Sequence, residues 1–263
     1  MDLTGQTALI TGSSKNIGRA IAVRMAQQGA TVGITAHSDR EGCEETLALV
    51  EEAGSSGSIA IGDIGNPDDI TRMVSDIRED LGPIDTLVNN ASIRPAKEFE
   101  EITLEDWDRV HNVNARSILL FAQEVLPDMR EVGHGSIVNL HGEIIYRGSM
   151  HKAHVAASKS AAMGLTLSLA SRFGPENIRA NGVAPGRAIK TDRDTGNYPG
   201  WETQLRNIVD ATPMRRRGEP EEIADVCCFL CSQEASFVTG QIIQVNGGLF
   251  PTIHLKNVGS EDD

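Results

Sequence analysis

The fold is decided by Leu9-Ile10-Thr11-Gly12-Ser13-Ser14-Lys15-Asn16-Ile17-Gly18, which leads from an apolar strand through a glycine-containing turn into a helix. Gly12 permits the tight turn, and Gly18 lets the helix approach the sheet. The free N–H groups and the partial positive charge at the start of this helix predict a site for a pyrophosphate. A glycine turn alone is a weak signal, because many turns hold glycine for backbone reasons only.

Outward from this stretch, apolar strand-like runs alternate with amphipathic helical runs along the whole chain. This alternation predicts an α/β, single-domain Rossmann fold, in which helices cover both faces of a doubly wound parallel sheet of about seven strands. The predicted strands are 7–11, 31–35, 58–62, 84–89, 135–140, 178–184 and 241–245. The predicted helices lie near 17–29, 41–53, 67–81, 103–130, 152–174 and 219–232. Ligands of such sheets bind beyond the carboxyl ends of the strands.

The domain organisation is predicted to be simple. With 263 residues and no Pro/Gly-rich linker, residues 1–255 are expected to form one dinucleotide-binding and catalytic domain. The long polar segment 190–214 is predicted to be a mobile substrate lid. The acidic tail 256–263 is predicted to be disordered. The side chains expected to matter at the lid are Arg187, Arg193, Tyr198 and Trp201.

Composition limits the partners. The formal net charge of −13 argues against nucleic acid and anionic membranes, and a solvated acidic surface is favoured over adaptation to a saline habitat. No apolar run approaches the roughly 18 residues of a membrane span, so we expect a soluble, cytoplasmic protein. The cysteines are predicted to be reduced core residues despite one CxxC spacing, and they are Cys43, Cys227, Cys228 and Cys231.

Six motifs follow one another along nearly the whole chain. They are Thr11-Gly12-xxx-Asn16-Ile17-Gly18, Asp63-Ile64, Asn89-Asn90-Ala91-Ser92, Asn112-Val113-Asn114-Ala115, Pro185-Gly186 and Asn246-Gly247-Gly248. In this order and spacing they resemble the short-chain dehydrogenase/reductase family, and within it the 3-oxoacyl-ACP reductase-like branch. Asn16 replaces the family's middle glycine, which is tolerable because Asn adopts the left-handed region more readily than other side chains do. Ser92 replaces the last glycine of its motif.

The resemblance implies a nicotinamide dinucleotide cofactor. NAD-dependent relatives carry an Asp just after the second strand, where Ala36 stands here. NADP-dependent relatives often hold basic residues where His37 and Lys15 stand, so NADP(H) is favoured over NAD(H), although Asp39 could fold back toward the ribose. The implied cofactor-binding residues are Gly12, Ser14, Lys15, Asn16, Ile17, Gly18, His37, Ser38, Asp63, Ile64, Asn89, Ala91, Lys159, Pro185, Gly186 and Thr191.

The family's catalytic residues are only half retained. The resemblance implies a Tyr that exchanges a proton, a Lys four residues later, a Ser thirteen residues before the Tyr, and an Asn that anchors a water. Asn114 matches the family's Asn and Lys159 matches its Lys. Val155, however, stands at the Tyr position and Gly142 at the Ser position. Since neither side chain can transfer a proton, the usual carbonyl–alcohol mechanism cannot run as written. Lys159 also has a non-catalytic explanation, which is to grip the ribose.

Nearby side chains are the candidate substitutes. On a helix, positions 151, 155 and 159 share a face, which makes His151 a candidate proton donor. Tyr146 is a second candidate, because a dienoyl-CoA reductase branch uses a Tyr from this loop, although at a position two residues away. His154 is offset by roughly 100° and is predicted to face a neighbouring element. His141 and Glu143 complete the cluster. Each of these side chains has an ordinary explanation as a solvated loop residue, and no spacing matches a metal site.

Three functions remain open from the sequence. The leading one is an atypical NADP(H)-dependent oxidoreductase that acts on a small carbonyl or a conjugated enone-type substrate. The alternatives are a lyase, dehydratase or isomerase without net hydride transfer, and a catalytically inactive nucleotide-binding partner subunit. The helices near 103–130 and 152–174 resemble those that pair across the family's dimer interface, so a homodimer or homotetramer is expected.

Overall fold

The protein is described by a computed structural model that places residues 1–192 and 200–250. Seven parallel strands form one sheet in the order β3-β2-β1-β4-β5-β6-β7. The strands are β1 (Thr7–Ile10), β2 (Thr31–Ala36), β3 (Gly57–Ile61), β4 (Thr86–Asn89), β5 (Gly135–Leu140), β6 (Ile178–Pro185) and β7 (Ile242–Val245). The doubly wound α/β sheet and all seven strands are therefore confirmed, with ends that lie within two residues of the prediction.

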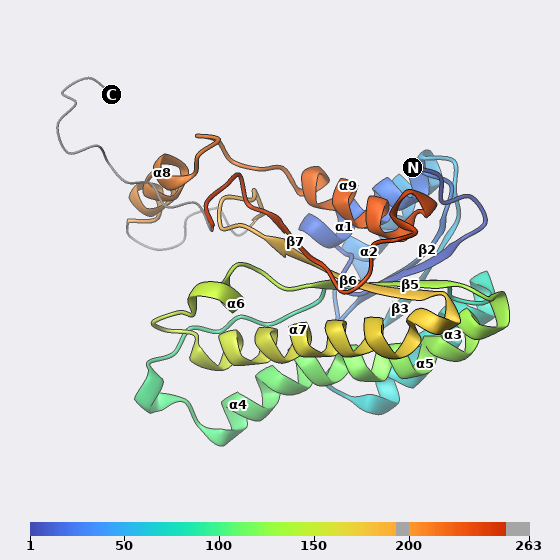
Figure 1. Ribbon diagram of the computed structural model, residues 1–263, viewed down its shortest axis with the longest axis horizontal. Helices are drawn as coiled ribbons and strands as arrows, with labels where there is room; N and C mark the ends of the chain where they lie inside the picture. The colour runs from blue at the N-terminus through green and yellow to red at the C-terminus, as the bar shows by residue number, and fades with distance from the viewer. Residues whose placement is uncertain (193–199, 251–263) are drawn as a thin grey trace.

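Helices cover both faces of this sheet, as Figure 1 shows. They are α1 (Asn16–Gln27), α2 (Arg40–Glu52), α3 (Pro67–Leu81), α4 (Leu104–His111), α5 (Ser117–Val132), α6 (Ile144–Arg147), α7 (Ala153–Phe173), α8 (Trp201–Ala211) and α9 (Pro220–Cys231). Buried side chains of α1, α2 and α9 form the core on one face, and those of α3, α5 and α7 form the core on the other. Successive residues of β1 serve the two cores in turn: Ala8 and Ile10 face the first, and Leu9 faces the second.

Local signals explain where several helices begin. Asn66 accepts a hydrogen bond from the Asp68 N–H at the start of α3, and a proline follows at the first helical position. Thr103 and Asp106 form a reciprocal capping box at the start of α4. These residues satisfy backbone N–H groups that a helix start leaves without a partner.

The predicted helix at 103–130 is not continuous. It consists of α4, a π-helical turn at Asn112–Arg116, and α5. Short π segments widen a helix locally, and they are frequent at functional sites. Here the wide turn holds Asn114, whose side chain is buried. The uniform helical pattern of the sequence gives no sign of this interruption.

The predicted lid contains a helix that the polar sequence did not suggest. Helix α8 occupies Trp201–Ala211, inside the segment 190–214. Residues 193–199, and with them Arg193 and Tyr198, lie outside the described residues, as does the tail 256–263. The mobility of this segment and the boundary of the domain at residue 255 stay predictions.

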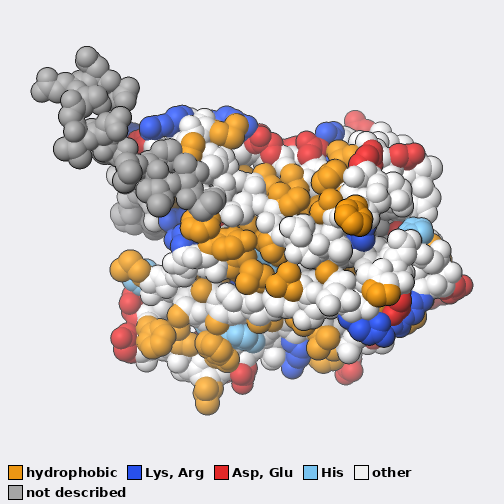
Figure 2. All heavy atoms as spheres, viewed as in Figure 1, with side chains coloured by type: hydrophobic (Ala, Val, Ile, Leu, Met, Phe, Trp, Pro, Cys, Tyr) orange, Lys and Arg blue, Asp and Glu red, His pale blue; other side chains and the backbone are white. Residues whose placement is uncertain are grey.

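Exposed apolar side chains gather at one end of the molecule. Figure 2 shows them at the lower left, where Figure 1 places α4. Phe99, Leu104 and Trp107 are 68%, 82% and 40% exposed, respectively. They lie near the start of one of the two helical regions expected to pair between subunits, and the oligomer stays a prediction. Among the described residues, no helix is both long and apolar enough to cross a bilayer.

Candidate functional site

The site lies at the carboxyl edge of the sheet, where the strand order reverses between β1 and β4. Neighbouring strands there lead to helices on opposite faces, so their loops part and leave a crevice for a ligand. The segments that follow β1 to β6 carry the residues predicted from the sequence, among which Asn114 lies in the π-helical turn and Lys159 on α7. The fold therefore brings these separate motifs to one edge.

The glycine turn after β1 has the backbone that a close approach requires. Gly12 has a φ of +65°, and a Cβ on it would lie 2.8 Å from the Cβ of Ala91. A Cβ on Gly18 would lie only 2.1 Å from the carbonyl oxygen of Gly12. Gly18 thus allows α1 to lie close to the glycine turn itself, whereas the sequence predicts a close approach to the sheet. Asn16 has a φ of +52°, which confirms that this Asn takes the left-handed conformation expected of the glycine it replaces.

Asn90 fixes the turn to the end of β4. Its side-chain amide donates to the carbonyl oxygens of Thr11 and Gly12, both at 2.9 Å. In return, the Thr11 hydroxyl oxygen accepts hydrogen bonds from the N–H groups of Asn90 and Ala91, at 3.0 and 3.1 Å. The sequence predicts Asn89 and Ala91 as cofactor-binding residues but does not indicate the structural role of Asn90. Its position inside the Asn89-Asn90-Ala91-Ser92 motif was the available signal.

The first turn of α1 suits a phosphate group. It holds no acidic residue, and no side chain caps its N-terminus. Among the described residues, its backbone N–H groups and the positive end of the helix dipole are therefore available to an anion. Ser14, Lys15 and Asn16 line an open hollow beside this turn. These features, together with the close glycine contacts, fit the dinucleotide that the resemblance implies.

The expected adenine end is built around Asp63. Its carboxylate accepts a hydrogen bond from Arg109 at 2.9 Å and lies 3.8 Å from His37 Nδ1. Burial opposes the charge of Asp63, but the Gly65 N–H and the Arg109 guanidinium outweigh burial and lower its pKa. Asp39 caps α2 by accepting from the Gly42 N–H. It is therefore engaged at the helix and does not fold back over the end of β2.

Asn114 and Lys159, the two retained catalytic-type residues, are both buried. Asn114 donates to the carbonyl of Ile93 at 2.9 Å and to the hydroxyl of Ser158 at 3.0 Å. The Lys159 ammonium donates to the carbonyl of Leu140 at 2.7 Å. Burial, helped by the positive charge of Arg94, lowers the pKa of Lys159 to about 7. Lys159 is thus poised to gain or lose a proton near neutral pH.

Val155 and Gly142 differ in how they fill the positions of the family's Tyr and Ser. Val155 is buried on α7, one turn before Lys159. Gly142 has a φ of +119°, and a Cβ built on it would meet no atom of the described residues within 4 Å. The space there is open, but the backbone conformation is one that side-chain-bearing residues rarely adopt.

His151 does not share a helical face with Val155 and Lys159, so that prediction is wrong, because α7 begins only at Ala153. The N-cap residue Lys152 has φ −145° and ψ 42°, so His151 lies outside the helix and off the shared face. Its ring nitrogen lies 3.0 Å from the Glu98 carboxylate, and its side chain is half-exposed. His154 is fully buried, and Asp106 and His111 of α4 act on its charge, so it faces a neighbouring element as predicted.

Tyr146 lies on the short helix α6 and is 39% exposed. Its ring stacks on Phe250, with ring centroids 5.2 Å apart and an angle of 14° between the planes. This contact joins the loop after β5 to the chain segment that follows β7. The catalytic roles assigned to Tyr146, His151, Asn114 and Lys159 stay predictions.

His141 and Glu143 flank Gly142 and are both buried. Within the described residues, Nδ1 of His141 and Oε2 of Glu143 have no hydrogen-bond partner. The other Glu143 oxygen pairs with Arg147 at 2.9 Å. Burial, with the Lys159 charge as a second cause, lowers the pKa of His141 to about 3. His141 is therefore neutral at physiological pH.

A chain of buried polar side chains connects His141 to the cofactor edge. The Asn89 amide donates to Asn139 at 2.8 Å, Asn139 donates to the Thr166 hydroxyl at 2.9 Å, and that hydroxyl lies 3.3 Å from His141 Nε2. Asn89 is thus occupied inside the protein, where it orders β4 against β5. Its predicted part in cofactor binding stays a prediction.

The loop after β6 closes the other side of the crevice. A Cβ on Gly186 would lie 2.7 Å from the Cα of Asn246, so the Pro185-Gly186 turn packs directly on the last-strand motif. Beyond it, Asp192 reaches back to the glycine turn and accepts a hydrogen bond from Asn16 at 2.6 Å. Thr191, the last predicted cofactor residue, immediately precedes this contact.

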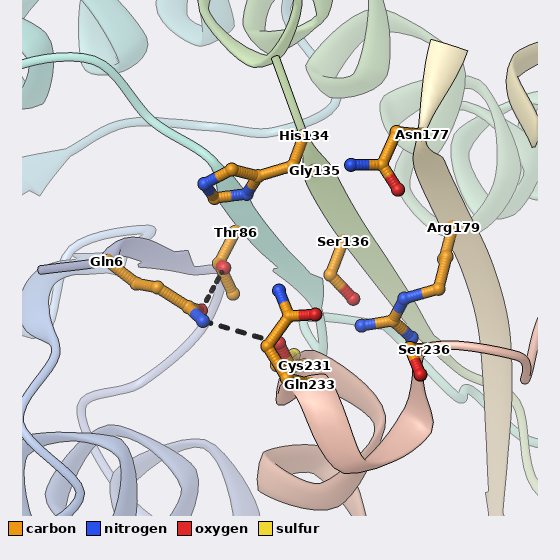
Figure 3. A pocket seen from close by; sticks show the side chains of 10 residues that line it. All are labelled: Gln6, Thr86, His134, Gly135, Ser136, Asn177, Arg179, Cys231, Gln233 and Ser236. Atoms are coloured by element: carbon orange, nitrogen blue, oxygen red, sulfur yellow. Dashed lines mark hydrogen bonds between the residues drawn. The ribbon is translucent and has the colours of Figure 1, made fainter. Parts of the chain in front are cut away.

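A second polar pocket lies at the opposite edge of the sheet (Figure 3). Gln6, Thr86, Ser136 and Arg179 from the amino-terminal ends of four strands line it. The Arg179 guanidinium there donates to main-chain carbonyls, including that of Leu230 at 2.6 Å. This pocket is remote from the predicted chemistry. Throughout the part of the chain that is described, no three His, Cys, Asp or Glu residues gather as metal ligands would.

Comparison with known proteins identifies the class to which this fold and site belong. The family model described as Enoyl-(Acyl carrier protein) reductase matches residues 12–250. The chain belongs to the short-chain dehydrogenase/reductase family of oxidoreductases.

Individual relatives are similar over almost their full length. The 3-oxoacyl-[acyl-carrier-protein] reductase of Aquifex aeolicus is 37% identical, over 94% of this chain and 98% of the relative. Glucose 1-dehydrogenase 2 of Bacillus subtilis is 34% identical, over 94% and 96%. The structure of L-sorbose reductase from Gluconobacter frateurii, complexed with NADPH and L-sorbose, has a TM-score of 0.90 at 28% identity and covers 96% of this chain and 99% of that chain.

Proposed function

We propose that this chain is an NADP(H)-dependent oxidoreductase with a non-standard catalytic centre, which acts on a small carbonyl or a conjugated enone-type substrate. The observation that carries the proposal is the set of residues that lie together at one edge of the sheet. The close glycine turn, Asn114 and Lys159 are in place, whereas Val155 and Gly142 offer no group that transfers a proton. When bound, the nicotinamide would supply or accept a hydride.

The chain's own residues would then bind and handle the proton. The N–H groups at the start of α1 would hold the pyrophosphate, and Lys159 would hold the ribose. Lys159 is the best-placed group to exchange a proton, directly or through a water that Asn114 helps to hold. His151 and Tyr146 stay candidates at the rim, and both are more exposed than Lys159. A conjugated substrate would ease the task, since its carbonyl can delocalise the developing charge.

The preference for NADP(H) has two supports. Ala36 ends β2 where a carboxylate would repel a 2′-phosphate, and Asp39 is engaged as the cap of α2. Lys15 and His37 supply positive or protonatable groups on that side of the turn. We expect Ser38, next to His37, to take part through its hydroxyl or N–H group.

Fluorescence titration of the purified chain with NADPH and with NADH tests the proposal. We expect saturable binding of both, tighter for NADPH, followed by oxidation of the bound reduced cofactor when a panel of small ketones, aldehydes and enones is added. Failure to bind either nucleotide would refute the proposed function.

Proton transfer without hydride transfer is the second candidate, and one observation favours it. His141 and Glu143 are buried acid–base groups beside Gly142, and each has one atom that finds no hydrogen-bond partner among the described residues. A lyase, dehydratase or isomerase could use either of them. Turnover of substrate with no change in nicotinamide absorbance would select this candidate over the first.

A further inference from the structure

A carboxylate from a distant part of the chain contacts the glycine turn. Asp192 Oδ1 accepts from Asn16 Nδ2 at 2.6 Å, and the Asp192 N–H donates to Asn16 Oδ1 at 2.8 Å. Asp192 Oδ2 lies 3.4 Å from the Lys15 ammonium. These three contacts, which we call the Asp192 clamp, join the turn after β1 to the loop after β6.

The clamp depends on the residue that departs from the family pattern. A glycine at position 16 would have no side chain with which to contact Asp192. Asn16 keeps the left-handed backbone, with a φ of +52°, and adds an amide that both donates to and accepts from Asp192. The paired hydrogen bonds hold the carboxylate beside Lys15.

The surroundings make Lys15 the decisive cation. The hollow beside the turn is lined by two basic residues and four acidic ones, namely Lys15, Arg19, Asp39, Glu41, Glu45 and Asp192. Arg19 donates to the Ser14 and Gly42 carbonyls and to Glu45, at 2.5, 3.2 and 2.7 Å. A phosphate that entered this hollow would therefore depend on Lys15 for attraction, and Asp192 competes for that charge.

We propose that Asp192 is a cofactor-selectivity residue, which neutralises Lys15 and thereby weakens the preference for the dinucleotide that carries a 2′-phosphate. This inference rests on the proposed function, because it assumes that the turn binds a nicotinamide dinucleotide. Both cofactors bring a pyrophosphate, but NADPH brings an additional phosphate with nearly two negative charges. Because the 2′-phosphate depends on Lys15 for attraction, neutralisation of Lys15 by Asp192 weakens binding of NADPH more than binding of NADH.

The test compares Asp192→Asn with the unaltered chain. This variant keeps the shape of the side chain and an oxygen that can accept from Asn16, but it removes the charge. Dissociation constants for NADPH and NADH are measured by fluorescence titration at low salt. Because the Lys15–Asp192 pair is about half exposed, we expect the ratio of the two constants to shift toward NADPH by about three- to fivefold. The shift should shrink at high salt.

Asp225→Asn is the matched control. Asp225, on α9, forms an ion pair at 2.6 Å with Arg24 in the last turn of α1, at the end of that helix opposite to Lys15, and the pair has similar exposure. The Asp225→Asn substitution removes the same charge from the protein, and the selectivity ratio should stay within twofold of its original value. An equal shift in both variants would mean that net charge alone is responsible, and it would overturn the inference.

Lys15→Met completes the test. In a chain that carries Lys15→Met, adding Asp192→Asn should no longer change the ratio. The reason is that the Lys15 charge, for which Asp192 and the phosphate compete, is absent. If the unaltered chain binds both cofactors and Asp192→Asn leaves the ratio unchanged, this inference is wrong and the proposed function stands. If the unaltered chain binds neither cofactor, both are wrong.

Discussion

Replacement of Gly142 by alanine separates a lack of space from a lack of backbone freedom at the position of the family's Ser. A Cβ there would meet no atom within 4 Å among residues 1–192 and 200–250, so the added methyl group causes no clash with them. The φ of +119° is nevertheless unfavourable for any residue with a Cβ. Gly142→Ala should therefore destabilise the protein even though it fits.

The magnitude follows from the backbone. Holding a residue other than glycine in such a sparsely populated region costs of order 1–3 kcal/mol. In a protein of this size, 1 kcal/mol corresponds to roughly 2–4 °C in the melting temperature. We expect Gly142→Ala to lower the free energy of unfolding by about 2 kcal/mol, measured by urea denaturation followed by circular dichroism.

Gly164→Ala is the matched control for this substitution. A Cβ built on Gly164 also meets no described atom within 4 Å, but Gly164 lies inside α7 with ordinary helical backbone. Alanine is the better helix former, so this variant should gain about 0.5–1 kcal/mol. If Gly142→Ala proves as stable as Gly164→Ala, the backbone conformation at residue 142 is one that residues with a Cβ can adopt without strain. A Ser could then be introduced there without loss of stability.

Three further predictions follow from the site and the core. Lys159→Met should stabilise the protein most at pH 6 and progressively less toward pH 10 in denaturation series. The folded-state pKa of Lys159, about 7, lies below the ordinary 10.5, so between these values the unfolded chain binds more protons than the folded one. The stability of the unaltered protein therefore rises with pH in this window, and the advantage of the Met variant shrinks. Gly18→Ala should weaken NADPH binding at least tenfold in the fluorescence titration, since its Cβ would lie 2.1 Å from the Gly12 carbonyl oxygen; unchanged affinity would contradict the assigned turn. The four buried cysteines, whose thiol pKa values are raised chiefly by burial, should react with a thiol reagent only after denaturation, and prompt labelling of any of them in the native protein would show that the core is open.

The sheet and the glycine turn could be predicted because their signals are local. Each strand of a sheet covered on both faces is a continuous apolar run, and each run is visible without knowledge of its neighbours. The conformation of Asn16 could be predicted for the same reason, since a left-handed turn restricts the residue that occupies it. Contact with distant residues was not needed for either inference.

The errors concern features that depend on where helices start and on contacts across the chain. His151 was assigned to α7 by spacing alone, but Lys152 leaves the helical conformation and the helix begins at Ala153. The π turn around Asn114 leaves the apolar pattern of 103–130 unchanged, so periodicity cannot reveal it. The contact of Asp192 with Asn16 joins residues 176 positions apart, and no local pattern indicates it.

The two departures from the family's catalytic pattern differ in kind, and this difference affects how the proposed mechanism should be investigated. Val155 is a change of side chain on regular helix, one turn from Lys159. Gly142 is a change of both side chain and backbone, because its φ of +119° excludes the ordinary conformations of Ser. A double replacement by Tyr and Ser therefore alters the loop as well as the chemistry, and a lack of activity in it would not reveal the native reaction. The more direct approach begins with the groups that the fold already holds in place, which are Lys159 against the Leu140 carbonyl and Asn114 against Ser158.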